Sequence, residues 1–405
     1  MRFEVEALAG GGRGVARSDG RVVLVAGALP GELVEVEVER QRAGVVEART
    51  IAVVRASPWR EPEPCPVAER CGGCDLAHVG RDAAAEVLRA VVIGALRHAP
   101  PALARAAAQA PVTLSPMAWR LRARLHWDAA TGRLGFLRRR SHDVLAIDAC
   151  RVISPTLLGA LPGLAGALAN AGSPAGQVVW LETLDGGRAV AGWLGPGRPP
   201  AVAPAPLTGW HRLDRRGATR GGWGEEGISI ELARPLWVPV GAFFQGNRHL
   251  VPRLFARVAS LAAASGCRRV VDLYGGVGLL GAAARHGGCA EVIVVEAQAV
   301  AAAAARRNLP DATVVGTSAE RFLAGPGPAA ACAIVDPPRQ GLTPAARQAL
   351  AAWSPAVVLA LSCDAARFGR DAAALLAAGY ALETLEIWDL FAGSHHAELL
   401  ALFRR

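Results

Sequence analysis

The C-terminal part of the chain repeats a pattern of short apolar runs separated by longer amphipathic stretches. The apolar runs lie at 269–273, 291–296, 332–335, 356–361, 381–388 and 397–403. Runs of this length suit buried strands, and the stretches between them suit helices. Strands that alternate with helices are typical of a parallel sheet covered by helices on both faces. We therefore predict an α/β, Rossmann-like domain over residues 241–405.

The N-terminal part has a different pattern, in which apolar and polar residues alternate over short distances between glycines. Val22–Val25 and Val34–Val38 flank the turn-like segment Leu29–Glu32. Alternation with such turns is typical of small β-barrels. We predict a barrel over residues 1–56, followed by a proline-rich linker.

Residues 57–240 make up the predicted central α+β domain. Residues 82–110 are Ala-rich and helical in pattern, with a break at Pro100, and are a candidate to pack on the C-terminal domain instead. Residues 115–240 are mostly strand-like, with loops rich in proline and glycine.

A hairpin is predicted where basic and apolar residues alternate around a turn at Thr131 and Gly132. One of its faces would be apolar and the other basic. The basic positions are Arg120, Arg122, Arg124, Arg138, Arg139 and Arg140. Such a face either tracks the phosphates of a nucleic acid or is simply the solvated side of a sheet.

Charge and cysteine content narrow the class of protein. The net charge is +9, and all 44 basic residues are Arg, which suits bidentate phosphate contacts and stacking on bases. Base bias in the genome would explain Arg in place of Lys but not the positive excess, which favours a polyanionic partner. The first residues alternate in charge, unlike a signal peptide, and no apolar run is long enough to span a bilayer. We expect a cytoplasmic protein whose eight cysteines bind metal, act in catalysis or are buried, rather than forming disulfides.

A glycine loop follows the first predicted strand of the C-terminal domain. The segment Asp272–Gly278 contains glycines that let a ligand approach the backbone, and Glu296 ends the next strand, where a carboxylate can hold ribose hydroxyls. The loop lacks the Lys-Ser/Thr pair of a P-loop. This pattern favours an adenosine cofactor without a pyrophosphate, such as S-adenosylmethionine.

Three further groups lie at predicted strand ends. Asp336 begins an Asp-Pro-Pro-Arg corner, Cys363 ends an apolar run, and Glu398 directly precedes another. Ligands of open α/β sheets bind at the carboxyl ends of the strands. A lone cysteine is usually a core residue and a Pro-Pro corner is often only a turn. At a shared edge, however, a thiolate and a carboxylate form a workable pair for covalent catalysis.

A second cysteine group lies in the proline- and glycine-rich segment after the barrel. Cys65, Cys71 and Cys74 are closely spaced there, and Cys150 follows much later. Four cysteines can hold either zinc or an iron–sulfur cluster, and both remain open at this point. Cys267, Cys289 and Cys332 lie in or near predicted core strands, and we interpret them as structural.

Together these features resemble the RNA 5-methyluridine methyltransferases, and more narrowly the branch with an N-terminal TRAM domain and a 4Fe–4S cluster. The resemblance covers nearly the whole chain. Gly11–Ala16 and Pro30–Glu32 resemble the TRAM signature, an OB-like barrel that binds RNA, and Phe244–Asn247 resembles a stretch whose Gln contacts the cofactor. The four cysteines named above match the cluster ligands in spacing. Ser362–Asp364 matches the nucleophile motif.

The resemblance implies a role for each matching residue. S-adenosylmethionine would be bound by Gln245, Tyr274, Gly276, Glu296 and Asp336. Cys363 would add to C6 of uracil, and Glu398 would take the C5 proton after methyl transfer. The cluster would shape the RNA-binding part rather than carry electrons.

The sequence departs from the family pattern at a few positions. Leu279 stands where many members have Asn, Ser318 where Asn or Asp is usual, and Ala365 where Pro is frequent. The resemblance implies 23S rRNA as the substrate, with transfer RNA as the alternative, and a monomer as the oligomeric state.

Two other interpretations of the sequence exist. One is an adenine N-methyltransferase, which Arg339 and Cys363 disfavour. The other is a non-catalytic iron–sulfur RNA-binding protein, which an intact Cys363 and Glu398 disfavour.

Overall fold

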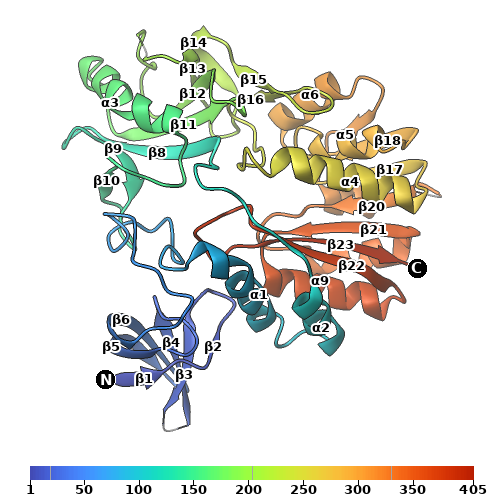
Figure 1. Cartoon of the computed structure of the whole chain (residues 1–405). Helices are drawn as coiled ribbons and strands as arrows, with labels where there is room; N and C mark the ends of the chain where they lie inside the picture. Colours follow the sequence, from blue (N-terminus) through green and yellow to red (C-terminus); the bar gives the residue numbers. More distant parts are fainter. Residues whose placement is uncertain (19, 203, 330) are drawn as a thin grey trace.

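The chain folds into an N-terminal, a central and a C-terminal region, and residues 84–113, between the first two in sequence, join the C-terminal one (Figure 1). The computed structural model describes residues 1–18, 20–202, 204–329 and 331–405. An N-terminal β-sheet lies at one end, a larger sheet with one helix lies at the other, and a helix-covered sheet lies beside both. The exact boundaries of the three predicted domains stay a prediction.

The N-terminal region is a curled β-sheet with the strand order β1-β5-β6-β4-β3-β2. Its strands are β1 (Arg2–Glu4), β2 (Ala7–Leu8), β3 (Gly14–Ser18), β4 (Arg21–Ala26), β5 (Leu33–Arg42) and β6 (Val45–Arg55). Alternate residues such as Val23 and Val25 face inward and form a core of their own. The buried Glu32 closes this region onto the linker, because its carboxylate accepts hydrogen bonds from Leu29 N at 2.8 Å and Arg60 Nε at 2.5 Å.

The C-terminal sheet has the strand order β19-β18-β17-β20-β21-β23-β22-β7. Its strands are β17 (Arg269–Leu273), β18 (Glu291–Val295), β19 (Thr313–Val315), β20 (Ala331–Val335), β21 (Val357–Ser362), β22 (Ala381–Trp388), β23 (Glu398–Arg404) and β7 (Val112–Thr113). The strands β17 to β21 are parallel, and β23 runs antiparallel to β21 and β22. All six strands predicted for this domain are present with ends shifted by one residue at most, so the predicted α/β class is confirmed.

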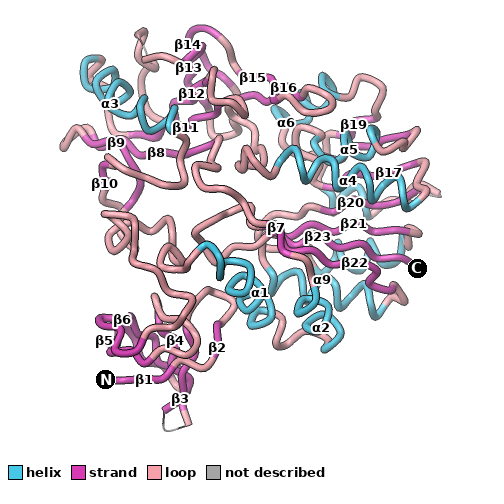
Figure 2. Tube along the Cα trace, viewed as in Figure 1, coloured by secondary structure: helices cyan, strands magenta, loops and turns pink. Residues whose placement is uncertain are grey.

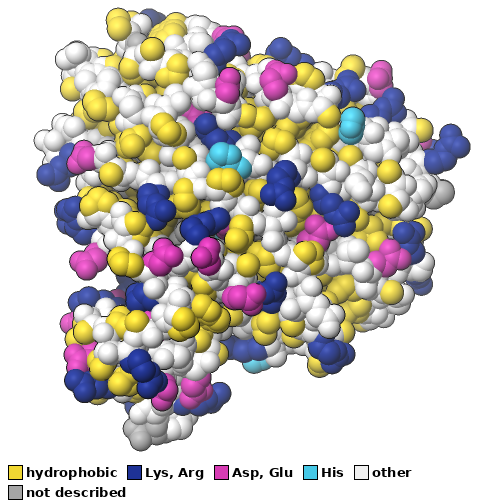
Figure 3. Space-filling view, in the orientation of Figure 1, with side chains coloured by type: hydrophobic (Ala, Val, Ile, Leu, Met, Phe, Trp, Pro, Cys, Tyr) yellow, Lys and Arg dark blue, Asp and Glu magenta, His cyan; other side chains and the backbone are white. Residues whose placement is uncertain are grey.

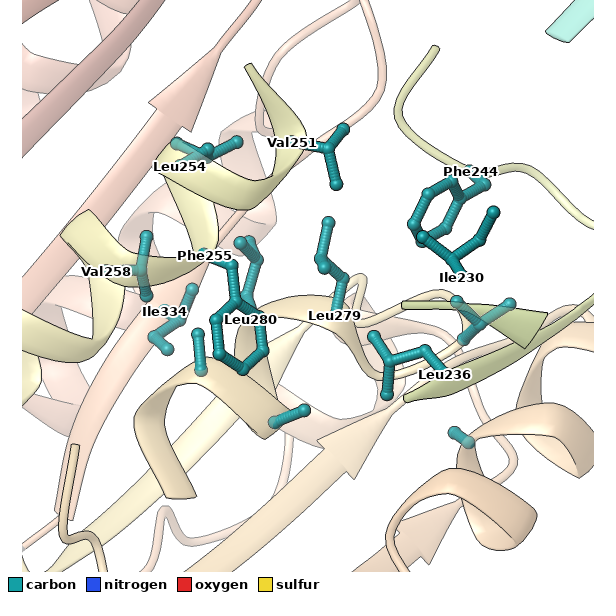
Figure 4. Packing of buried hydrophobic residues seen from close by; sticks show 14 of the residues in the cluster. Ile230, Leu236, Phe244, Val251, Leu254, Phe255, Val258, Leu279, Leu280 and Ile334 are labelled. Atoms are coloured by element: carbon teal, nitrogen blue, oxygen red, sulfur yellow. The ribbon is translucent and has the colours of Figure 1, made fainter. Parts of the chain in front are cut away.

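Helices cover both faces of this sheet, because its central strands are apolar on both sides. One face carries α4 (Val251–Ser265), α5 (Leu279–His286) and α6 (Ala299–Asn308). Figure 4 shows Phe255 and Val258 of α4 packed toward Leu280 of α5 and Ile334 of β20. The other face carries α7 (Ala319–Leu323), α8 (Pro344–Trp353) and α9 (Ala365–Ala377).

Two further helices on this second face come from a distant part of the sequence. A 3-10 turn (Arg81–Ala83) leads into α1 (Ala84–Ala95), and α2 (Pro101–Gln109) follows after the predicted break. Both contribute buried residues to the same apolar cluster as α9 and the C-terminal sheet. The strand β7 then pairs with β22, which extends the sheet.

The central region is built on a sheet with the order β10-β9-β8-β11-β12-β13-β14 (Figure 2). Its strands are β8 (Arg122–Asp128), β9 (Arg133–Leu137), β10 (Val144–Ala146), β11 (Gly176–Glu182), β12 (Ala189–Leu194), β13 (Leu207–Leu213) and β14 (Thr219–Gly224). The predicted hairpin is present as β8 and β9, with His126 opposite Gly135. The hairpin β15 (Gly227–Ile230) and β16 (Leu236–Pro239) joins the α4 side of the C-terminal core.

The region also contains a helix that the sequence pattern did not reveal, α3 (Pro155–Asn170). Ser154 caps it by accepting a hydrogen bond from Leu157 N at 2.9 Å, and Pro155 takes the first helical position. Pro162 lies inside the helix, and a proline there normally argues against one, which is why the stretch did not look helical.

Cys267 and Cys332 form a disulfide, which corrects the expectation that no cysteine is disulfide-bonded. Cys267 lies two residues before β17, and Cys332 lies in the neighbouring strand β20. Because Arg269 pairs with Ala331, the strand register brings the two cysteines together, with Cα atoms 6.0 Å apart. Cys289 is buried with a free thiol, as expected of a structural residue.

Among the described residues, no helix combines the length and the apolar character needed to cross a bilayer. On the face shown in Figure 3, Arg side chains are interspersed with Asp and Glu rather than gathered into one uniform patch.

Candidate active site

The candidate catalytic and cofactor-binding residues lie at one edge of the C-terminal sheet. Glu296, Asp336 and Cys363 directly follow the parallel strands β18, β20 and β21. Glu398 begins β23, which is antiparallel to β21, so its first residue lies at the same edge. The pairing of Ser362 with Leu399 brings Cys363 and Glu398 next to each other.

Cys363 and Glu398 are buried to different degrees, and burial affects the charge of both. Burial, followed by the charge of Glu398, raises the pKa of the half-buried Cys363 thiol to about 12. Glu398 is 1% exposed, and burial together with Asp336 raises its pKa well above the usual range. Its Oε1 atom is buried without a hydrogen-bond partner among the described residues. Burial thus disfavours the charged form of both groups in the free protein.

Arg339 is a site residue whose role the sequence reasoning missed. It follows the Pro-Pro corner, and its side chain is exposed. Its positive charge lowers the pKa of Cys363 and so opposes the effect of burial. The only signal in the sequence was its place directly after the Asp-Pro-Pro corner.

The glycine loop has a backbone shaped to leave room for a ligand. Tyr274, Gly276 and Gly278 all have positive φ, at 62°, 55° and 88°. Glu296 holds this loop, because its Oε2 accepts a hydrogen bond from Gly276 N at 2.9 Å and its Oε1 accepts one from Gln298 N at 2.5 Å. The carboxylate is thus fixed at the end of β18, where ribose hydroxyls would bind.

Tyr274 turns its hydroxyl away from the strand ends, toward α7. It donates a hydrogen bond to Glu320 Oε1 at 2.9 Å. Burial and this acidic partner both raise the pKa of Tyr274. The tyrosine side chain is therefore uncharged and borders the loop.

Two carboxyl groups, the buried Asp272 and the partly buried Asp336, lie toward the ends of the neighbouring strands β17 and β20. Burial raises the pKa of Asp272 to about 8 and the pKa of Asp336 to about 6. Gln245 is aimed at the second of them, with Nε2 3.5 Å from Asp336 Oδ2. Asp272 Oδ2 accepts a hydrogen bond from Gly281 N at 2.8 Å, and its Oδ1 has no partner among the described residues. The ionised form of Asp336 suits a cationic ligand.

Asn247, in the same stretch as Gln245, ties neighbouring segments together. Its Nδ2 donates hydrogen bonds to Ser115 Oγ at 2.9 Å and Leu390 O at 3.1 Å. Its Oδ1 accepts from Leu250 N at 3.0 Å, at the start of α4. Asn247 thus fixes the position of Gln245 by connecting the three segments around it.

The second cysteine group borders a cavity of about 520 Å³ that lies apart from Cys363 and Glu398. Cys65, Cys71, Cys74 and Cys150 all line it. Burial, and then the neighbouring Cys150, raises the pKa of Cys74 to about 12. Within the described ranges, no group of three or more His, Cys, Asp or Glu residues is arranged to hold a metal ion.

The six arginines of the predicted basic face do not share one environment. Arg124, Arg138, Arg139 and Arg140 are exposed, whereas Arg120 and Arg122 are partly buried. The guanidinium of Arg120 lies 4.8 Å from the ring centre of Trp119 and borders the cysteine cavity. Burial lowers the pKa of Arg122 to about 10. The three arginines at 138–140 follow β9 rather than lying within it. The basic face is therefore smaller than the alternation suggested.

Comparisons with known proteins agree with this architecture. Residues 1–51 match the TRAM domain. The 23S rRNA (uracil(1939)-C(5))-methyltransferase RlmD of Pseudomonas putida is 31% identical over 440 residues, covering 100% of this chain and 93% of the relative. The protein of the same name from Halomonas elongata is 32% identical, covering 98% of this chain and 88% of the relative.

A solved structure has the same fold over its full length. It is the tRNA (uracil-54, C5)-methyltransferase of Pyrococcus abyssi in complex with S-adenosyl-L-homocysteine, with a TM-score of 0.76 and 24% identity over 100% of both chains. This likeness shows the fold, and the full-length relatives show the class, which is that of the methyltransferases. With the relatives above, the chain belongs to the RNA 5-methyluridine methyltransferase family.

Proposed function

We propose that this protein transfers a methyl group from S-adenosylmethionine to C5 of a uridine in RNA, with 23S rRNA as its substrate. The full-length relatives named for 23S rRNA support the substrate class. The adjacency of Cys363 and Glu398 at the cofactor edge of the sheet is the observation that carries the mechanism.

The chemistry needs a nucleophile because C5 of uracil is too weak to attack a methyl sulfonium directly. The thiolate of Cys363 adds to C6, the C5=C6 electron pair moves toward C5 and O4, and C5 becomes enolate-like. S-adenosylmethionine supplies an electrophilic methyl group, which bonds to C5 while its bond to sulfur breaks. Glu398 then takes the C5 proton, the double bond reforms, and the electrons of the C6–S bond return to Cys363.

This order of events uses the ionised form of both groups, the thiolate of Cys363 and the carboxylate of Glu398. Cys363 is a neutral thiol in the free protein, with Arg339 as the cation that favours its thiolate. A buried base with a raised pKa accepts a carbon-bound proton more readily than an exposed carboxylate. The unpartnered Oε1 of Glu398 is free to accept the C5 proton.

The cofactor would occupy the glycine loop. Glu296 would hold the ribose hydroxyls, and Asp336 with Gln245 would face the charged part of the cofactor. Gly276 lets the chain pass close to the adenosine. Tyr274 would form the side of the pocket.

A 4Fe–4S cluster is the proposed occupant of the cysteine cavity. Cys65, Cys71, Cys74 and Cys150 border one space of about 520 Å³, and four thiols are the usual donors of such a cluster. Zinc fits less well, because no described group of side chains is arranged around a single ion. The role proposed for the cluster is structural, since it would join the segment after the barrel to the central region.

RNA would be held by the TRAM sheet and by the exposed arginines near the cavity, chiefly Arg124 and Arg138–Arg140. These residues would bind the phosphate backbone, while the target base leaves its stack to reach Cys363. We propose a cytoplasmic monomer.

The test is methyl transfer from radiolabelled S-adenosylmethionine into RNA from cells that lack this modification. Separated 23S, 16S and transfer RNA are each digested to nucleosides. We expect label in 5-methyluridine from 23S rRNA alone. Label in transfer RNA would overturn the substrate, and label in another nucleoside would overturn the chemistry.

A further inference from the structure

The loop between β22 and β23, residues 389–397, leads directly into Glu398 and is held from outside the C-terminal sheet. Its first half is fixed by core contacts. Trp119 Nε1 donates a hydrogen bond to Ala392 O at 3.1 Å, and Asn247 Nδ2 donates one to Leu390 O at 3.1 Å. Its second half, residues 393–397, is held from outside by residues 65–76, which contain Cys65, Cys71 and Cys74 and are called the cysteine segment below.

The cysteine segment makes several contacts with this second half. Leu76 N donates a hydrogen bond to Gly393 O at 3.1 Å, and His395 N donates one to Asp75 Oδ1 at 2.9 Å. The imidazole Nδ1 of His395 makes a close contact with Asp75 Oδ2, so this carboxylate holds both the backbone and the ring. Cys74 lies against Gly393, where an added Cβ would be 3.3 Å from its Sγ.

The TRAM sheet reaches the same histidine. Gly12 lies in the turn between β2 and β3, and a Cβ added there would be only 2.6 Å from Cβ of His395. The turn therefore packs closely against the histidine. The barrel, the cysteine segment and the loop before Glu398 all meet at His395.

Glu398 depends on this loop for its position. Its Oε1 is buried and has no hydrogen-bond partner among the described residues, so no side chain fixes that oxygen. The direction of the carboxylate is then set by the backbone at the start of β23, three residues after His395. A shift of the loop would move the base relative to the C5 proton.

We propose that Asp75 and His395 are positioning residues that hold Glu398 in place for proton removal, linking the cysteine segment to the last chemical step. This inference rests on the proposed function, because it assumes that Glu398 takes the C5 proton. Loss of the pair slows the step in which that proton moves to Glu398, the C5=C6 bond reforms and the C6–S bond breaks. Addition of Cys363 and methyl transfer precede that step, so the covalent RNA adduct accumulates.

The experiment compares Asp75→Ala, His395→Ala and the double variant in the full-length, metal-loaded protein. Asp75→Asn keeps an oxygen that can accept from His395 N and serves as the conservative variant. Glu383→Ala is the matched control, because Glu383 accepts a hydrogen bond from Arg404 Nε at 2.7 Å across the same two strands at their other end. Each variant is measured for kcat and KM with RNA, for the fraction of RNA in an adduct that survives denaturation, and for iron content and Tm.

We expect kcat to fall roughly tenfold to a hundredfold in each alanine variant, since small misplacements of a reacting group have effects of that size. KM should stay within about twofold, and the adduct fraction should rise. The kcat of the double variant should be no lower than that of the slower single variant, because the two residues act as a unit. Asp75→Asn should recover most of kcat, and Glu383→Ala should match the wild type.

Other outcomes overturn the inference. A higher KM with unchanged kcat and no adduct would show that Asp75 and His395 act in RNA binding instead. Wild-type kcat and KM in both alanine variants would show that the pair does not position Glu398. If Asp75→Ala loses iron or does not fold, the inference is tested with His395→Ala and the milder His395→Asn instead. His395 lies outside the cysteine segment, so these changes leave that segment intact. Failure of the proposed function is read separately, from a wild-type protein that forms no 5-methyluridine or from an active Cys363→Ala variant.

Discussion

Asp336 is the residue whose ionisation most directly sets the charge of the cofactor site. Burial raises its pKa to about 6, against the lowering effect of the hydrogen bond from Gln245. Its carboxyl group is therefore neutral below that pH and negative above it. S-adenosylmethionine carries a sulfonium charge, so its binding should favour the ionised form.

We predict that the Kd for S-adenosylmethionine decreases by up to about tenfold between pH 5 and pH 7.5, as Asp336 loses its proton. Isothermal titration at the two pH values measures this. S-adenosyl-L-homocysteine lacks the sulfonium charge and should show a weaker dependence. An equally steep dependence in Asp336→Asn would contradict the assignment to this residue.

Arg339 should affect the ionisation of the nucleophile Cys363 rather than that of the base Glu398. Its charge lowers the pKa of Cys363, so Arg339→Gln raises that pKa further and reduces the thiolate fraction at neutral pH. We predict several-fold slower adduct formation near pH 7, with the rate recovering at higher pH. Single-turnover gel assays over a pH series measure it, with Arg253→Gln on the exposed side of α4 as the control. Unchanged adduct formation at pH 7 would remove Arg339 from the site.

At the scale of elements, α2 is a part of the C-terminal core that lies far from it in sequence. Leu103 is fully buried in the cluster that covers the second face of the sheet. We predict that Leu103→Ala lowers the free energy of unfolding by about 2–4 kcal/mol through loss of burial and the cavity left behind. Urea unfolding measures the change. Arg105→Ala, at an exposed position of the same helix, should have a free energy of unfolding within about 0.5 kcal/mol of the wild-type value.

The sequence was a good guide to elements with a strong pattern and a poor one elsewhere. The six long strands of the C-terminal sheet were predicted because apolar runs on both faces leave a clear signal. The strands β7 and β19 were missed because two or three residues carry no period. The helix α3 was missed because Pro162 breaks the expected pattern. The Cys267–Cys332 disulfide depends on the register of β17 and β20, which the sequence does not give.

At the scale of the whole molecule, the cysteine cavity joins two regions of the chain. Cys65, Cys71 and Cys74 come from the segment after the barrel, and Cys150 comes from the central region. We predict that Cys150→Ser lowers iron and sulfide content to a small fraction of the wild-type value and lowers Tm, because a bound cluster stabilises the folded state. Metal and sulfide analysis after anaerobic purification measures this. Cys289→Ala should keep its iron, and zinc without sulfide in the wild type would refute the cluster.

The candidate site combines residues that the sequence pattern brings together with a contact that the pattern does not reveal. Cys363, Asp336 and Glu398 could be placed together, because strand ends in a parallel sheet share one edge. The contact between Asp75 and His395 spans 320 residues and leaves no motif. It exists only because the barrel, the cysteine segment and the last hairpin pack against each other, which local patterns do not specify.

The covalent link between Cys363 and uridine is the central claim, and trapping it is the most direct test. Glu398→Gln is incubated with its RNA substrate and S-adenosylmethionine, then denatured and digested with protease and nuclease. Mass spectrometry should find a 5-methyluridine adduct on the peptide that contains Cys363, since the proton needed for elimination is no longer removed. An adduct on another residue, or wild-type methylation by Cys363→Ala, would contradict the account.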